Sequence, residues 1–144
     1  MKNPRRGASI VEFALVALQL CLLMLAAVEF GRMVLIYNNV ANAARVGVRY
    51  AITHGSTRTG AAGAPDGPAT AAQIQAVVID YAKSGLVDIN RLIITVAWPG
   101  LGNTNDPGFP VSVTVTYRYD PLVGAFAIPL NVNMGTTTKG IITF

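Results

Sequence analysis

The sequence predicts an α+β protein in which a long N-terminal helix packs on a small antiparallel sheet, with a second short helix beside it. Three observations lead to this fold class. An uncharged apolar run covers residues 13–28, and helical spacing continues to about residue 54 without a proline between Arg5 and Pro65. Residues 111–119 then alternate strictly between apolar and polar side chains, the pattern of a strand with one buried face.

The composition favours a membrane protein. Of the 144 residues 52% are hydrophobic and 12% are charged, against about 25% charged in a typical soluble domain. Residues 1–50 hold six basic and two acidic side chains, whereas residues 51–144 hold five of each. The excess positive charge therefore lies beside the apolar run, as expected for membrane topology. We expect no nucleic-acid partner, because residues 51–144 carry no basic cluster.

The apolar run, Phe13–Val28, is 16 residues long, slightly short of the roughly 20 residues that span a bilayer. The segment that can enter a membrane extends past residue 28 if Glu29 and Arg32 pair with each other at or near the membrane interface. These two residues are three apart and share one helical face. A cleaved secretory signal peptide is the alternative. It is disfavoured because Leu25-Ala26-Ala27 matches a cleavage site poorly and the helical pattern does not break there.

Beyond the apolar run the helix becomes amphipathic. Apolar residues recur at spacings of three and four from Tyr37 to Ala51, which is the pattern of one buried helical face. We expect one helix from about residue 9 to about residue 54, roughly 70 Å long at about 1.5 Å per residue. This exceeds twice the apolar thickness of a bilayer, so the second half must pack on a folded head.

The remaining chain divides into short elements. Residues 55–70 have the composition of a flexible linker, and Thr70 is a candidate cap for the second helix. The elements expected after it are a helix over 71–83, strands over 91–98, 111–119 and 137–144, a loop over 99–110 and a short apolar connection over 121–129. The amphipathic half of the first helix would cover the apolar face of this sheet.

Glu12 is an acid at the start of the apolar run, directly before Phe13. Alone, it is compatible with an interfacial carboxylate stabilised by the helix macrodipole. A cut between Gly7 and Ala8 would create an α-amino group and make Glu12 the fifth residue of the mature chain. A neighbouring subunit's amine about 4 Å away would attract it by roughly 4 kcal/mol before desolvation at an effective dielectric constant near 20. Such a pair could set the register between parallel helices.

Three blocks of this sequence together resemble a known family. Gly7-Ala-Ser-Ile-Val-Glu-Phe is similar to the processing site of class III signal peptides in type IV pilins. With Val28-Glu-Phe-Gly-Arg and Asn42-Ala-Ala-Arg-Val-Gly-Val-Arg-Tyr-Ala, it resembles the TadE-like pseudopilins of tight-adherence (Flp-type) pilus systems. The similar TadF-type pseudopilins share much of the N-terminal pattern. The match covers about residues 5–55.

The resemblance implies a pilin-like fold and a minor subunit required for pilus assembly. A prepilin peptidase of the bacterial inner membrane would remove residues 1–7, with Gly7 and Ala8 at the cut and Glu12 and Phe13 serving assembly and register. Residues 8–54 would form the long helix, residues 55–70 the linker and residues 71–144 a head in the periplasm or outside the cell. The N-terminus would face the cytoplasm, and the partners would be other pilin and pseudopilin subunits.

The sequence shows no pattern typical of an enzyme. The five Asp residues are scattered and His54 is the single histidine, so we expect no catalytic site, metal or other cofactor and no small-molecule substrate. His54 lies near the expected end of the long helix, and Cys21 is expected to be a small core residue. The alternative function is a single-span, membrane-anchored periplasmic binding or scaffold protein that is not polymerised.

Overall fold

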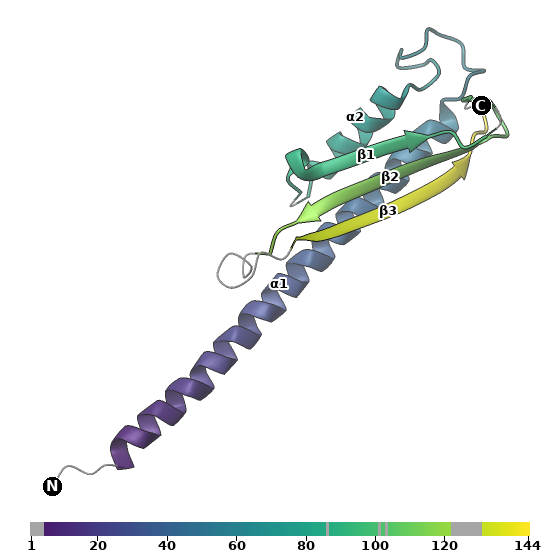
Figure 1. Ribbon diagram of the computed structural model, residues 1–144. Helices are drawn as coiled ribbons and strands as arrows, with labels where there is room; N and C mark the ends of the chain where they lie inside the picture. The colour runs from purple at the N-terminus through teal and green to yellow at the C-terminus, as the bar shows by residue number, and fades with distance from the viewer. Residues whose placement is uncertain (1–4, 86, 101, 103, 122–130) are drawn as a thin grey trace.

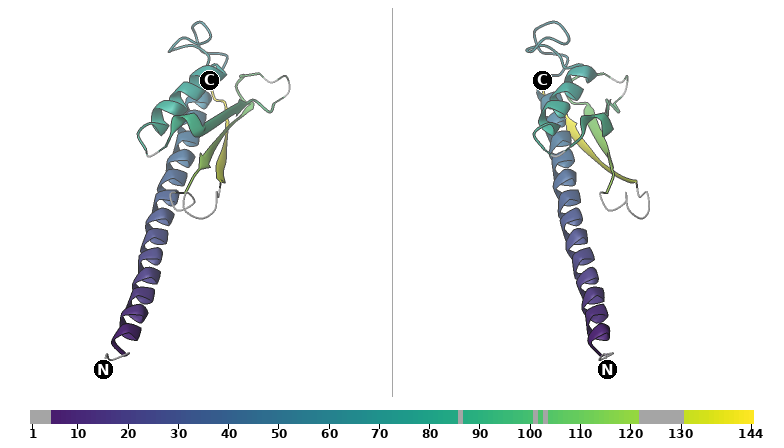
Figure 2. Two further views of the ribbon diagram at one scale, coloured as in Figure 1. Left: turned by 60° about the vertical axis from the view of Figure 1, so that its left-hand side comes forward. Right: turned by 90° about the vertical axis from the view of Figure 1, so that its left-hand side faces the viewer.

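The computed structural model describes residues 5–85, 87–100, 102, 104–121 and 131–144, with only the backbone for residues 5 and 6 (Figure 1). It confirms the predicted α+β class. Its elements are α1 (Arg5–Thr53), α2 (Ala71–Ala82), the 3-10 turn η1 (Ile89–Arg91), β1 (Leu92–Ala97), β2 (Pro110–Tyr119) and β3 (Val132–Ile141). The two helices lie side by side on one face of the sheet, and α1 continues far beyond it (Figures 1 and 2).

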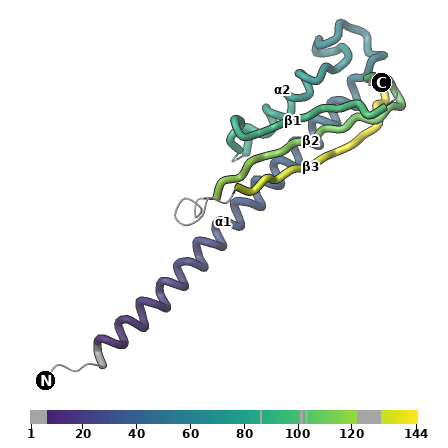
Figure 3. Tube along the Cα trace, viewed as in Figure 1, coloured from purple at the N-terminus to yellow at the C-terminus, as the bar shows by residue number. Residues whose placement is uncertain are grey.

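Helix α1 is one unbroken rod, as the chain trace shows (Figure 3). It begins at Arg5, four residues before the expected start, and ends at Thr53. At its end the His54 ring stacks on Tyr50 with ring centroids 4.0 Å apart, and His54 Nδ1 lies 2.9 Å from the Tyr50 carbonyl oxygen. The histidine therefore closes the last turn of the helix.

The two halves of α1 have different surroundings. The C-terminal half buries Ile36, Val40, Ala43, Ala44, Val48 and Ala51 in the core of the head. In the N-terminal half the large apolar side chains are exposed on all sides of the helix. The prediction that Cys21 is a core residue is wrong, because this half of the helix lies outside the head and Cys21 is exposed.

Helix α2 begins with the cap that the sequence predicts. The Thr70 hydroxyl accepts a hydrogen bond from the Gln73 backbone N–H, and the Gln73 side chain accepts one from the Thr70 N–H in return. This capping box satisfies backbone donors that a helix start leaves without intrahelical partners. The buried side chains Ile74 and Val78 face α1, and the Gln75 side-chain amide donates to the Ile94 carbonyl of β1 at 3.2 Å.

The three strands form an antiparallel sheet in the order β1-β2-β3. The predicted alternation of β2 is confirmed, with inward side chains 0–4% exposed; these are Val111, Val113, Val115, Tyr117 and Tyr119. In β1, Leu92, Ile94 and Val96 share the inner face, and the following Trp98 is partly buried against the core. One face of the sheet therefore packs on the helices and the other is open to solvent.

The predicted bounds of the third strand, residues 137–144, are wrong. Strand β3 runs from Val132 to Ile141. Pairing explains the shift, since the strand follows β2 along its whole length, from Tyr119↔Val132 to Pro110↔Ile141. The glycines and the threonine run in this segment give little apolar alternation from which to read the strand. The expected connection over 121–129 lies outside the described residues except for Pro121.

Residues 55–69 contain no helix or strand, yet they are tied to the head. The Ala69 N–H donates to the His54 carbonyl at 2.8 Å, and the Asn105 side-chain amide donates to the carbonyls of His54 and Ala69. The Ser56 hydroxyl donates to the Asp106 carboxylate, and this bond, with another from Thr104, lowers the pKa of Asp106. Both ends of the segment expected to be a flexible linker are therefore fixed by hydrogen bonds.

The two glycines of α1 provide a matched test of the helix packing. A Cβ atom on Gly47 would lie 2.4 Å from Cγ2 of the buried Val78, whereas no described residue places an atom within 4 Å of a Cβ atom on Gly31. Gly47→Ala should therefore lower the free energy of unfolding of the head by about 1–3 kcal/mol. Gly31→Ala should leave it unchanged or raise it by up to about 1 kcal/mol. Thermal unfolding of the detergent-solubilised protein compares them, and equal stabilities would contradict the close approach of α1 and α2.

Candidate functional site

The residues expected to serve processing and assembly lie together on the first turns of α1. Gly7, Ala8, Glu12 and Phe13 are all helical and exposed, and the Phe13 side chain is 74% exposed. A Cβ atom on Gly7 would find nothing within 4 Å in the described part of the chain. The head lies at the other end of the helix (Figure 1). The four residues are therefore accessible to a second protein.

The N-terminal half of α1 has the properties of a membrane span. Its most apolar 18-residue window has a mean hydropathy of 2.4, and none of the window is buried inside the protein. A core helix of a soluble protein would bury one face, whereas here large side chains such as Leu22 and Leu23 are more than half exposed on different sides of the helix. The apolar interior of a bilayer gives such a surface a favourable environment, so this helix fits a single-pass membrane anchor.

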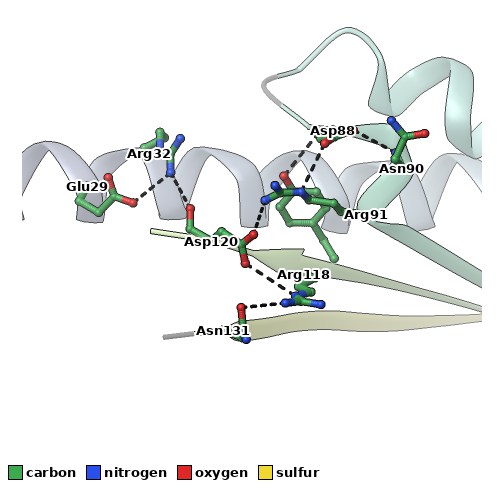
Figure 4. A network of polar contacts seen from close by, with 9 residues as sticks. Glu29, Arg32, Asp88, Asn90, Arg91, Arg118, Asp120 and Asn131 are labelled. Carbon is green, nitrogen blue, oxygen red and sulfur yellow. Dashed lines mark hydrogen bonds and ion pairs between the residues drawn. The ribbon is translucent and has the colours of Figure 1, made fainter. Parts of the chain in front are cut away.

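A polar network joins the anchor to the head where the apolar run ends. Arg32 Nη2 lies 3.0 Å from Glu29 Oε1, so the ion pair expected from the sequence forms within α1 (Figure 4). Arg32 also reaches the end of β2, where Nε donates to the Tyr119 hydroxyl at 3.1 Å and Nη2 donates to the Asp120 carbonyl at 3.1 Å. Its guanidinium carbon lies 5.0 Å from the centre of the Tyr119 ring, within cation–π range.

Tyr119 completes this junction. It is 2% exposed, and its hydroxyl donates to the Glu29 carboxylate. Burial is the main reason that the pKa of Tyr119 is raised, and the hydrogen bond to Glu29 raises it further. The phenol therefore keeps its proton at neutral pH and remains a donor. Hydrogen bonds therefore join α1 to the end of β2 through three residues that contact one another. We call these residues, Glu29, Arg32 and Tyr119, the junction triad.

Further ion pairs lie beside the junction triad, at the end of the sheet where β2 ends (Figure 4). The Asp120 carboxylate lies 2.7 Å from Arg91 Nη1 and 3.7 Å from Arg118 Nε, and Arg91 also pairs with Asp88 at 3.3 Å. These side chains are 38–59% exposed, so each pair contributes little to stability. Asp88, Arg91, Arg118 and Asp120 therefore form a charge-balanced group beside the end of β2, which we call the polar belt.

The sequence indicates only part of this site. The spacing of Glu29 and Arg32 predicts their pairing, but nothing in the pattern joins them to Tyr119, 87 residues beyond Arg32. The alternation of β2 places Tyr119 on the inner face without naming a partner for its hydroxyl. A buried tyrosine at the end of a strand does need such a partner, and that is the signal from which the contact could have been sought.

In the part of the chain that the structure describes, the fold fits a protein with one helix as membrane anchor and a small α+β head. Residues 7–49, which form almost all of α1, match the family described as TadE-like protein. The similarity to TadE-like proteins covers this region, which is less than a third of the chain. No curated protein and no solved structure matches the chain.

Tyr119→Phe tests the junction triad, because it removes the hydroxyl and keeps the ring. We expect the free energy of unfolding of the head to fall by about 1.5–3 kcal/mol, the range for a hydrogen bond to a charged group. Tyr117→Phe is the control, since that similarly buried ring lies on the same strand and its hydroxyl accepts, among the described residues, one long hydrogen bond, 3.5 Å from the Asp88 N–H. Thermal unfolding in detergent measures both variants, and an equal loss would mean that the junction triad adds no stability.

Proposed function

We propose that this protein is a minor pilin-like subunit, a pseudopilin, required for the assembly of a tight-adherence type IV pilus. A prepilin peptidase would cut it after Gly7 and release residues 1–7. The observation that carries the proposal is the segment Gly7–Phe13, which is helical, exposed and at the start of the membrane helix, within the region that matches the TadE-like family. A plain anchor has no need of both a small residue at position 7 and an acid at position 12.

The proposed assembly step uses charge for register and apolar surface for affinity. Cleavage would leave Ala8 with a protonated amine, and the exposed Glu12 carboxylate is available to the amine of a neighbouring subunit. Around it, Ile10, Phe13 and Val16 are 60–74% exposed and available to the helix of that neighbour. A carboxylate in the membrane is costly without a partner, which favours pairing over isolation.

The proposed location is the bacterial inner membrane, with a single span, the N-terminus in the cytoplasm and the head in the periplasm. In an assembled pilus the head would be extracellular. The partners are the prepilin peptidase and other pilin or pseudopilin subunits, and the role is structural rather than catalytic. The exposed apolar side chains of the N-terminal half of α1 support both the membrane location and the assembly with other subunits. They suit lipid before assembly and neighbouring helices afterwards.

The N-terminus of the membrane-extracted protein tests this function directly. Intact mass and terminal sequencing are compared for protein made with and without its prepilin peptidase. A terminus at Ala8 only with the peptidase is the expected result. An intact Met1 in both preparations would overturn the proposal in favour of a permanent anchor that is not polymerised, and a terminus near Val28 would indicate an ordinary secreted domain.

Gly7→Leu should abolish processing, because the resemblance implies that the peptidase accepts only a small residue before the cut. Gly7→Ala is the matched control and should still be processed. Neither change touches the head, since no described atom lies within 4 Å of a Cβ atom at this position. The readout is the mass of the extracted protein, and normal-sized mature Gly7→Leu protein would contradict the proposed cleavage site.

Glu12→Ala and Glu12→Gln should be processed normally but enter pilus assemblies poorly, because both remove the charge that pairs with a neighbouring amine. Ser9→Ala, at another exposed position of the same turns, should assemble as the wild type does. Recovery of each variant with the other pilus subunits, relative to its amount in the membrane, measures incorporation. Wild-type incorporation of Glu12→Gln would show that the charge sets no register.

A further inference from the structure

Among the described residues, an apolar groove lies between α1 and the end of the sheet where β2 ends and β3 begins. It encloses about 320 Å³ and is lined on one side by α1 and on the other by the end of the sheet. Its lining is mostly apolar, from Leu22, Leu25 and Phe30 of α1 and from Tyr119, Pro121 and Val132 of the head, and it includes Glu29. The groove is therefore built from two parts of the chain that would ordinarily be assigned to membrane and to water.

The position of the groove along α1 sets its depth in a bilayer. Residues 8–28 of the helix extend over about 30 Å at about 1.5 Å per residue, which is the apolar thickness of a bilayer. Glu29 then lies at the boundary on the head side. Leu25 and Leu22 lie four and seven residues before it, about 6 Å and 10 Å into the apolar layer. Head residues that share a groove with these leucines must lie at or below the membrane surface.

The surroundings of the groove change from charged residues near the head to apolar residues along α1. Arg32 contacts the groove residues Glu29 and Tyr119 and the Asp120 carbonyl, and the Asp120 carboxylate pairs with Arg91 and Arg118. Toward the N-terminus, α1 exposes apolar side chains back to Phe13 with Gln19 as a polar exception, and Leu22, Leu25 and Phe30 belong both to that surface and to the groove. An apolar groove below a charged belt matches the transition from acyl chains to headgroups.

We propose that this groove is a lipid-binding surface, in which acyl chains of the leaflet on the head side pack between α1 and the end of the sheet. The head is thereby seated in the membrane surface and does not stand above it on the helix. Lipid is the occupant that the structure favours, because the groove is continuous with the exposed apolar surface of the span and opens at the depth of the acyl chains. The inference rests on the membrane anchoring included in the proposed function.

Depth measurements on spin-labelled full-length protein test this proposal. The protein is reconstituted at one copy per phosphatidylcholine nanodisc, so a second copy cannot fill the groove. One label is placed on Val132→Cys and a matched label on Ile141→Cys, at opposite ends of β3, both in a Cys21→Ser background. The native residues are 38% and 62% exposed. The wild-type Cys21, which is exposed within the span, carries the third label.

Accessibility to oxygen, which concentrates in lipid, is compared with accessibility to a water-soluble nickel chelate. The expected result is that oxygen exceeds the chelate at positions 21 and 132, with the opposite order at position 141. Greater access of the chelate than of oxygen at position 132 would overturn the lipid surface, as would low access of both reagents, which would mean that protein covers the groove. If the label on Cys21 were in water, the anchoring itself would fail, so the two failures are distinguishable.

Discussion

The structure depends on one constraint, which is that a single unbroken helix must suit two different solvents. From Phe13 to Val28 α1 exposes apolar side chains in every direction, as a helix in lipid does. From Ile36 onward it buries one stripe of side chains and leaves polar groups outside, as a helix on a soluble domain does. Since the helix does not break, the change from lipid-exposed to packed side chains must occur within the helix, between Val28 and Ile36.

The head depends on this helix in turn. A three-stranded sheet needs cover for its apolar face, and α1 with α2 provides it through small residues such as Ala43, Ala44 and Gly47. The junction triad adds a directed contact where the helix leaves the sheet. Because one unbroken helix forms both the anchor and part of the core of the head, the position of the anchor fixes the position of the head. This suits a subunit whose proposed function is to place its head at a defined position in an assembly.

Local patterns predicted the parts of this fold that local physics determines. Helix α1, the Thr70 cap and the alternation of β2 follow from spacing, capping chemistry and burial of one face. The bounds of β3 did not follow, because they are set by pairing with β2 across a long separation in sequence. The contact of Tyr119 with Glu29 was missed for the same reason. Cys21 was misassigned because an apolar neighbourhood in sequence does not distinguish a protein core from lipid.

The division of α1 into a lipid-exposed half and a packed half is the central claim. A nitroxide scan of oxygen accessibility along α1, one position at a time in nanodiscs, measures it most directly. We expect high values on all sides of the helix from Phe13 to Val28, and a repeat of about 3.6 residues from Ile36 onward. A 3.6-residue repeat over the first stretch as well would contradict this division, because one face of that half would then be packed on protein.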